Sequence, residues 1–179
     1  MKRYIVFLRG INISGKNNIP MAELKNGFED LGFREVKTYL NSGNVAFSNA
    51  GDDIRFFTNQ IETMLKMRFG LDIPVFVISK EELEDILLNA PDWWGNENKE
   101  IYDNLIFIMP PATFSDVFDE IGEAKEGLER VQGYKGVVFW SFSRKDYQKT
   151  KWWSKTATAN ISSQLTIRTA NTVRKIVGM

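Results

Sequence analysis

One succession of secondary-structure elements, strand–helix–strand–strand–helix–strand, can be assigned twice along the 179-residue chain. Strands are predicted from short runs rich in β-branched and aromatic residues, and helices from apolar residues spaced three and four apart. In the first half, strands are expected at 4–8, 36–40, 45–48 and 73–78, with helices at 20–31 and 53–69. In the second half, strands are expected at 105–109, 128–131, 137–142 and 165–168, with helices at 113–121 and 145–155. Two further helices, 79–89 and 170–177, follow the last strand of each half.

This succession predicts an α+β protein made of two ferredoxin-like halves in tandem, each of them a split βαβ unit. The segment 90–96, which contains a proline and two tryptophans, interrupts the pattern and is the expected junction. We therefore expect a first half at residues 1–89 and a second half at 90–179, the latter with a basic C-terminal segment. The two halves show no strong sequence similarity, so a duplication remains a hypothesis.

The chain contains neither histidine nor cysteine. A Ser-His-Asp triad, a cysteine nucleophile, a disulfide and a zinc site built from His or Cys are therefore excluded. Catalysis would have to use Asp, Glu, Lys, Tyr, Ser or Thr, and a metal would have to be a hard ion bound by oxygen, such as Mg²⁺. No cofactor and no metal site are predicted.

No apolar run approaches the ~20 residues that cross a membrane. The first apolar stretch, residues 4–8, is also shorter than the ~7–15 residues of a signal peptide's apolar region. We therefore expect a cytoplasmic protein without a membrane partner. The sequence leaves the oligomeric state open.

Two polar segments, residues 9–18 and 40–44, each follow a predicted strand of the first half. In a split βαβ unit the third strand runs antiparallel beside the first, so the end of strand one and the start of strand three share a sheet edge. Backbone N–H groups in loops rich in Gly and Asn can bind anions. The residues expected at this candidate ligand site are Arg9, Asn12, Gly15, Lys16, Asn41, Ser42 and Asn44. The alternative is that Asn and Gly only form the turns and that Lys16 is solvated.

The segment 10–16 also fits the start of a P-loop, G-x-x-x-x-G-K. Asn17 stands where the Ser or Thr that binds Mg²⁺ should be, and Pro20 indicates a helix that starts several residues after Lys16. No later strand ends in the aspartate of a second nucleotide motif. We therefore expect no nucleoside triphosphatase, although an anion held by backbone N–H groups remains open.

Positive charge is concentrated at the C-terminal end, although the formal net charge of the chain is zero. Residues 141–179 contain eight Lys or Arg residues and a single acidic residue, Asp146. Aromatic residues alternate with the basic ones there, as in sites that stack single-stranded nucleic acid. The residues expected to form such an interface are Arg144, Lys145, Lys149, Lys151, Trp152 and Lys155, with Trp152 or Trp153 as the stacking residue. The alternative is an amphipathic helix whose tryptophans belong to the core.

Three N-terminal segments, 8–12, 19–24 and 38–45, resemble the signature of the domain of unknown function 1697 family. The segment 166–173 resembles the closing motif of that family, although Thr169 and Ala170 stand where the family usually has Asn and Trp. The resemblance spans nearly the whole chain and implies a small, largely bacterial protein with an α+β fold of ferredoxin-like character. The family supplies no activity, cofactor or catalytic residues that could be carried over to this chain.

The leading functional prediction is a binding module for a small anionic or phosphate-bearing ligand, held at the strand-one loop and at the turn between strands two and three. The alternative is binding of RNA or single-stranded nucleic acid by the basic C-terminal face. A third hypothesis is an enzyme whose site lies between the two halves. No arrangement of carboxylates in the sequence indicates which reaction it would catalyse.

Overall fold

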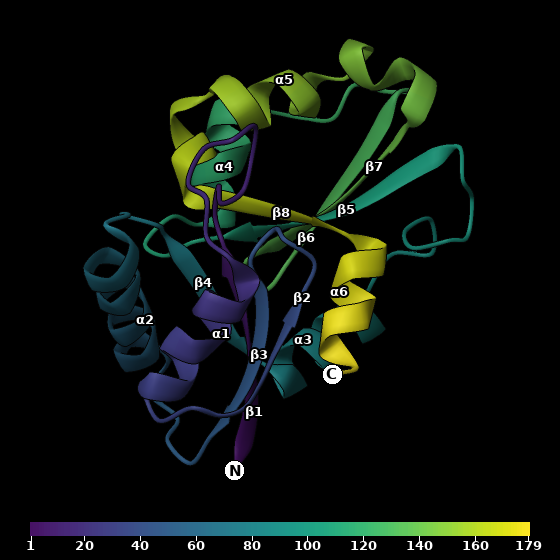
Figure 1. Ribbon diagram of the computed structural model, residues 1–179. Helices are drawn as coiled ribbons and strands as arrows, with labels where there is room; N and C mark the ends of the chain where they lie inside the picture. Colours follow the sequence, from purple (N-terminus) through teal and green to yellow (C-terminus); the bar gives the residue numbers. More distant parts are fainter. The chain divides into compact units, whose positions relative to one another are not determined.

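The computed structural model describes all residues, 1–179, and divides into two compact units (Figure 1). The first unit comprises Met1–Asp85 together with Lys175–Met179, and the second comprises Ile86–Arg174. Each unit contains one four-stranded sheet in which neighbouring strands are antiparallel. The prediction of an α+β protein in two halves is therefore confirmed.

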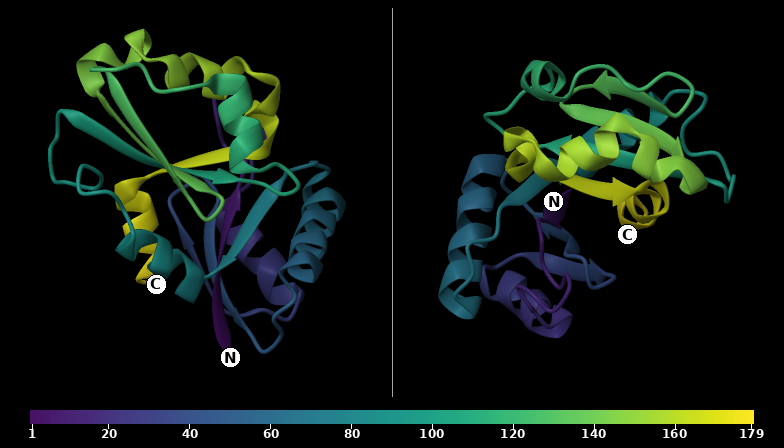
Figure 2. Two further views of the ribbon diagram at one scale, coloured as in Figure 1. Left: turned by 180° about the vertical axis from the view of Figure 1, so that it is seen from behind. Right: turned by 90° about the horizontal axis from the view of Figure 1, so that it is seen from above.

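The first unit follows the predicted order of strands and helices. Its elements are β1 (Lys2–Leu8), α1 (Met21–Asp30), β2 (Arg34–Tyr39), β3 (Asn44–Asn49), α2 (Ile54–Phe69) and β4 (Val75–Ser79). The strand order in the sheet is β2-β3-β1-β4, so β3 lies between β1 and β2 and is antiparallel to both. This is the pairing that a split βαβ unit requires. Helices α1 and α2 pack together and cover the sheet (Figures 1 and 2).

Local signals in the sequence set the ends of these helices. An Asp53 side-chain oxygen accepts a hydrogen bond from the backbone N–H of Phe56 at 2.9 Å and so caps α2. Helix α2 ends at Gly70, whose φ of +69° is a left-handed conformation that glycine adopts without a steric penalty. Pro20 immediately precedes α1. An N–H at this position would have no partner within the helix, so proline is tolerated there.

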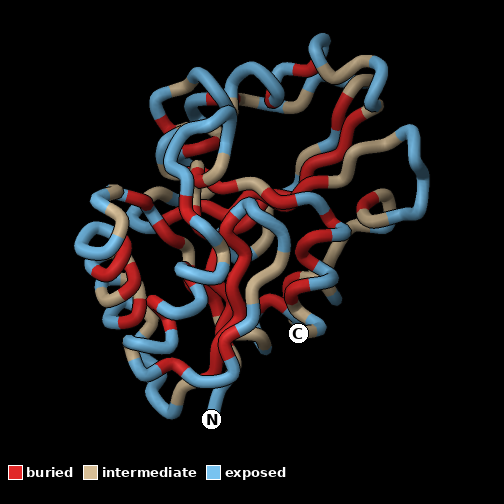
Figure 3. The backbone as a smooth tube through the Cα atoms, in the orientation of Figure 1, coloured by how far each residue is buried: buried red, intermediate tan, exposed pale blue.

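Buried residues of the sheet and its two helices form the core of the first unit (Figure 3), and many of them are aromatic. Phe33 and Phe47 stack with ring centroids 4.1 Å apart, and Phe57 meets Phe47 edge-on at 5.7 Å. Tyr4 and Phe28 complete the cluster, and all five side chains are buried. Aromatic pairs in these geometries add about 0.5–1.5 kcal/mol each beyond their buried area, so this cluster fixes how α1 and α2 pack on the sheet.

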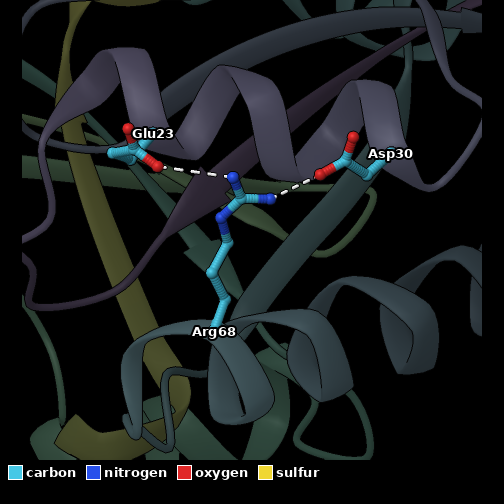
Figure 4. A network of polar contacts seen from close by, with 3 residues as sticks. All are labelled: Glu23, Asp30 and Arg68. Carbon is cyan, nitrogen blue, oxygen red and sulfur yellow. Dashed lines mark hydrogen bonds and ion pairs between the residues drawn. The ribbon is translucent and has the colours of Figure 1, made fainter.

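Arg68 links the two helices on their outer side (Figure 4). From α2 its guanidinium donates to a carboxylate oxygen of Asp30 at 2.6 Å and to one of Glu23 at 3.3 Å, both on α1. The hydrogen bond to Asp30 raises the pKa of Arg68, and the one to Glu23 adds to it. Because all three side chains are solvated, the network orients the helices more than it stabilises them.

The second unit repeats the strand order of the first. Helix α3 (Lys80–Leu88) follows β4 in the chain, and Ser79 Oγ, just before it, accepts a hydrogen bond from the N–H of Glu82 at 3.2 Å. Then follow β5 (Ile101–Ile108), α4 (Phe114–Ile121), β6 (Glu129–Tyr134), β7 (Val137–Ser143), the 3₁₀ helix η1 (Arg144–Lys149), α5 (Lys151–Thr158), the 3₁₀ helix η2 (Asn160–Gln164), β8 (Leu165–Thr169) and α6 (Ala170–Val177). The sheet has the order β6-β7-β5-β8.

The predicted single helix at 145–155 is wrong, because Thr150 divides it into η1 and α5. Thr150 has an extended backbone with φ −74° and ψ 152°, and it is buried. Its Oγ1 donates to the carbonyl of Tyr147 at 2.7 Å and accepts from the N–H of Trp153 at 3.3 Å. Such a hydroxyl ends one helical segment and caps the next. The segment η2, for which no element was predicted, then leads into β8.

A buried carboxylate joins β6 to the start of α5. Glu129 accepts hydrogen bonds from the backbone N–H groups of Lys151 at 2.6 Å and Trp152 at 3.1 Å. The Nε1 of Trp140 and the backbone N–H of Lys125 donate to the same carboxylate at 3.2 and 3.1 Å. Negative charge at a helix N-terminus is stabilising, so Glu129 positions α5 over the sheet.

None of the helices combines the length and the apolar character needed to cross a membrane.

Candidate functional site

The predicted ligand loop of the first unit forms a small hairpin. Ile13 and Lys16 pair across a two-residue turn, and the N–H of Lys16 donates to the carbonyl of Ile13 at 2.9 Å. Both turn residues, Ser14 and Gly15, have positive φ, 49° and 75°, as tight hairpin turns require. No helix starts at Lys16, because α1 begins at Met21, so the resemblance of this segment to a P-loop does not extend to its structure.

The two polar segments meet as the topology predicts. The N–H of Leu8 donates to the carbonyl of Gly43 at 2.8 Å, and Nδ2 of Asn12 donates to the carbonyl of Asn41 at 2.7 Å. Gly43 allows this approach, because a Cβ there would lie 2.7 Å from the Cβ of Leu8. The backbone N–H of Arg9 donates to the carbonyl of Pro74 at 3.0 Å and so fixes the start of the loop.

The asparagine side chains at this edge hold the loops together. Asn12 also binds the backbone of Ile19, through its Nδ2 at 2.9 Å and its Oδ1 at 2.7 Å. The buried Asn44 donates to the carbonyl of Tyr39 and to Oγ of Ser42, both at 2.9 Å. These amides are therefore engaged within the protein. Lys16 is exposed, and its ammonium has no partner in the chain.

At the basic C-terminal face, the two tryptophans of α5 differ in exposure. Trp152 is fully buried in the core of the second unit and cannot stack on a nucleic-acid base, which corrects its place in the predicted interface. Trp153 is 44% exposed and meets the ring of Tyr147 edge-on at 4.7 Å. The side chains of Arg144, Lys145, Lys151 and Lys155 form no ion pair, whereas Lys149 pairs with Asp146 at 2.9 Å.

The second unit also contains a pocket that the sequence analysis did not identify. We call it the arginine pocket. Its volume is about 400 Å³, and it is lined by residues 95–99, 101–103, 144, 169–171 and 174. Pairing of the strands brings these distant segments together, because Ile101 at the start of β5 lies opposite Ser143 at the end of β7, and Asn104 lies opposite Thr169 at the end of β8. The first turn of α6 follows β8 directly and adds its partial positive charge.

Aromatic rings position the two arginines of this pocket. The guanidinium carbon of Arg144 lies 3.9 Å from the ring centroid of Tyr102, and that of Arg174 lies 5.7 Å from the ring centroid of Trp94. Neither guanidinium makes a hydrogen bond or an ion pair, although Glu97 and Asp103 line the same pocket. A cation–π contact uses the flat face of the guanidinium. The N–H groups at the edge of both guanidinium groups therefore stay available to a ligand.

Gly95 makes room for Arg174. Its φ is +78°, and a Cβ at this position would overlap the Arg174 guanidinium. Trp94 is itself fixed, because its Nε1 donates to the carbonyl of Asn104 at 2.8 Å and its ring meets Phe139 edge-on. The sequence marks this segment only by a glycine after two tryptophans, and no local signal connects it with Arg174.

A second hollow, larger in volume, lies at the same end of the sheet. We call it the tryptophan hollow. Its volume is about 750 Å³, and it is lined by residues 93, 96, 101, 126–130 and 141–143. It shares Asn96 and Ile101 with the arginine pocket. Asp103 on β5 lies opposite Ser141 on β7, and their side chains are joined by a hydrogen bond. Asp103 lines the arginine pocket and Ser141 lines the tryptophan hollow.

The second unit also buries one cation. Burial lowers the pKa of Arg168 on β8 to about 10. Its Nη1 donates to Oγ1 of Thr166 at 3.0 Å and to the carbonyl of Ile167 at 2.9 Å. Arg168 lines neither cavity. No group of three or more Asp or Glu side chains is arranged to hold a metal ion.

Comparison with known proteins places the chain in a family. The family model described as "Protein of unknown function (DUF1697)" matches residues 1–139, so the chain belongs to this family and the resemblance seen in the sequence is confirmed. The match ends before the segment 166–173 that resembled the closing motif of the family. The comparison with curated proteins finds no match.

Among solved structures, the chain is similar to a conserved bacterial protein from Streptococcus pneumoniae. The two share 28% sequence identity with a TM-score of 0.86, over 99% of this chain and 97% of the other. A protein of unknown function from Galdieria sulphuraria shares 11% identity over 94% of this chain and 96% of the other, with a TM-score of 0.29. That score is too low to support an argument about fold or function.

Proposed function

We propose that this member of the DUF1697 family is a binding module for a small anionic or phosphate-bearing ligand, and that the arginine pocket holds it. The observation that supports this is the pair Arg144 and Arg174, which line one cavity with their N–H edges unpaired. A guanidinium presents parallel N–H donors that match the oxygens of a phosphate or carboxylate. Lys99, also unpaired, lines the same pocket and would add a third positive charge.

The loops of the first unit are the competing place for the same ligand. They were predicted from their composition, and they keep the Lys16 ammonium as a free cation. Most of the other polar side chains there are occupied, since Asn12 and Asn44 bond to the backbone of their own loops. The arginine pocket combines a measurable cavity with two unpaired cations, which is why we favour it.

Thermal unfolding with and without inorganic phosphate tests the proposal. A ligand present at 100 times its dissociation constant adds about 2.7 kcal/mol to the free energy of unfolding. The wild type should be stabilised by phosphate, and Arg174→Gln should lose most of that gain because one charge-assisted contact is removed. Lys145→Gln is the matched control, since it also removes one exposed charge and lies outside the pocket.

Lys16→Ala decides between the two places. If the arginine pocket holds the anion, this variant responds to phosphate as the wild type does. A response that vanishes in Lys16→Ala and persists in Arg174→Gln would place the ligand at the loops of the first unit. If phosphate, sulfate and small carboxylates all leave the wild type unchanged, the proposal of an anion-binding module is wrong.

Nucleic-acid binding is the second candidate, and the exposed ring of Trp153 favours it. This ring lies on the same short helix as Lys151 and Lys155, whose ammonium groups are free. Stacking of one base on an aromatic ring is worth about 1–3 kcal/mol. Fluorescence anisotropy with a short single-stranded RNA should show an affinity that falls steeply with salt and weakens in Trp153→Ala. An affinity that is independent of salt would remove this candidate.

A further inference from the structure

We propose that the ligand of the arginine pocket is an organic phosphate with a flat aromatic group, and that this group occupies the adjoining tryptophan hollow. This inference rests on the proposed function, because it needs an anion in the arginine pocket. It adds the chemical class of the rest of the ligand.

The size of the cavities is the first argument. Sites for small organic ligands measure about 300–1,000 Å³, and the arginine pocket and the tryptophan hollow, at about 400 and 750 Å³, both fall in that range. An inorganic anion would fill only a part of the arginine pocket. The remaining space suits a ligand that continues beyond its anionic group.

The position of the cavities is the second argument. Both lie at the end of the second sheet where β5 and β6 begin and where β7 and β8 end. Asn96 and Ile101 belong to both linings, and the hydrogen-bonded pair Asp103 and Ser141 connects one lining to the other. A ligand that passes Asn96 and Ile101 can therefore occupy both cavities at once.

The chemistry of the tryptophan hollow is the third argument. Trp93 is half-buried there, and its ring has no aromatic partner and its Nε1 no acceptor. The neighbouring Trp94, by contrast, uses its Nε1, its ring edge and its ring face within the protein. Ile101, Leu128 and Phe142 add apolar surface around Trp93. An indole with a free ring beside apolar side chains favours a flat aromatic group.

The charges of the two cavities fix the orientation of such a ligand. In the arginine pocket three cationic side chains, Lys99, Arg144 and Arg174, outnumber two carboxylates, Glu97 and Asp103. In the tryptophan hollow two carboxylates, Glu126 and Glu129, outnumber one cation, Arg130. The phosphate is therefore directed to the arginine pocket and the ring to the hollow. Nucleoside monophosphates and aryl phosphates share this chemistry, and the experiment includes one of each.

Isothermal titration calorimetry with four probes tests the inference: inorganic phosphate, methyl phosphate, phenyl phosphate and adenosine monophosphate. For the wild type, at least one of the two aromatic probes should bind about tenfold more tightly than methyl phosphate, the gain expected from stacking one ring. Trp93→Ala should remove this gain and leave the affinity for methyl phosphate unchanged. Trp93→Phe keeps a ring and should retain most of the gain. Phe56→Ala, which removes an exposed aromatic ring of the first unit, should behave as the wild type.

The outcomes separate this inference from the proposed function. Equal affinities for methyl phosphate and for both aromatic probes would overturn the inference and leave the anion-binding module standing. A tenfold gain that persists in Trp93→Ala would also overturn it, since the ring would then lie elsewhere. If none of the four probes binds the wild type, the proposed function fails and the inference fails with it. Arg174→Gln should weaken all four probes together.

Discussion

Among single residues, Glu129 is the one whose carboxylate accepts the most hydrogen bonds. Four N–H groups donate to its two oxygens, and the side chain is almost fully buried. Glu129→Gln preserves the size but replaces one oxygen by an NH₂ group, which would then face N–H donors. Because unsatisfied buried donors cost about 1–3 kcal/mol, and more where a charge was involved, we expect a loss of about 2 kcal/mol or more.

The free energy of unfolding in urea measures this loss. Glu126→Gln is the matched control, because Glu126 is exposed and should change stability by less than about 0.5 kcal/mol. Equal stabilities of the two variants would contradict the role assigned to the Glu129 carboxylate.

The acid dependence of the first unit should involve Glu35. The hydrogen bond from Ser48 Oγ, at 2.6 Å, lowers the pKa of this carboxyl, and the nearby charges of Arg3 and Lys37 lower it further. Since the folded pKa lies below the unfolded one, the stabilisation is present above the unfolded pKa and is lost as the pH falls through the folded pKa.

Ser48→Ala removes the largest cause of this shift. We expect the pKa of Glu35 to rise towards its ordinary value and the stability of the variant to depend less on pH in the acid range. An NMR titration of the Glu35 carboxyl carbon measures the change directly. Ser115→Ala, an exposed serine of the second unit, should leave this titration as it is in the wild type, and an unchanged pKa in Ser48→Ala would refute the assignment.

At the scale of elements, helix ends were predictable where a cap acts within a few residues. Thr169 directly precedes the helix that was expected at 170–177, and its Oγ1 accepts a hydrogen bond from the N–H of Thr172 at 3.3 Å. Residues 145–155 were predicted as one helix, because their basic and aromatic pattern fits helical spacing. The break at Thr150 depends on a hydroxyl that is buried only in the folded unit, which no periodicity reveals.

Thr150→Val should therefore destabilise the boundary between η1 and α5. The valine keeps the shape of the side chain but loses the cap on Trp153 N and the bond to the Tyr147 carbonyl. Loss of an N-cap costs about 0.5–2 kcal/mol, and thermal unfolding should show a loss of that size. Thr158→Val, at the exposed end of α5, is the control, and a Thr150 variant as stable as this control would argue against the cap.

For the whole molecule, the fold was predictable and the candidate pocket was not. The order of strands and helices follows from apolar spacing, turns and caps, all of which are local. The arginine pocket instead joins residues near 95, 144 and 174, which come together only when β5 pairs with β7 and β8. Arg144 was noticed for its charge, but as part of a nucleic-acid face. Arg174 and Gly95 carry no local pattern that indicates a site.

A phosphate titration, followed by NMR of all backbone amides, tests which of the two candidate sites binds the anion. If the arginine pocket binds the anion, the amide resonances of residues 95–103, 144 and 169–171 should shift, because they line or adjoin the cavity. Those of residues 9–18 and 41–44 should stay in place. Arg174→Gln should suppress the shifts at equal phosphate concentration, since it removes one cation while the strand pairing that builds the cavity is retained. Shifts confined to the first-unit loops would show that the composition of those loops, and not the unpaired arginines, marks the binding site.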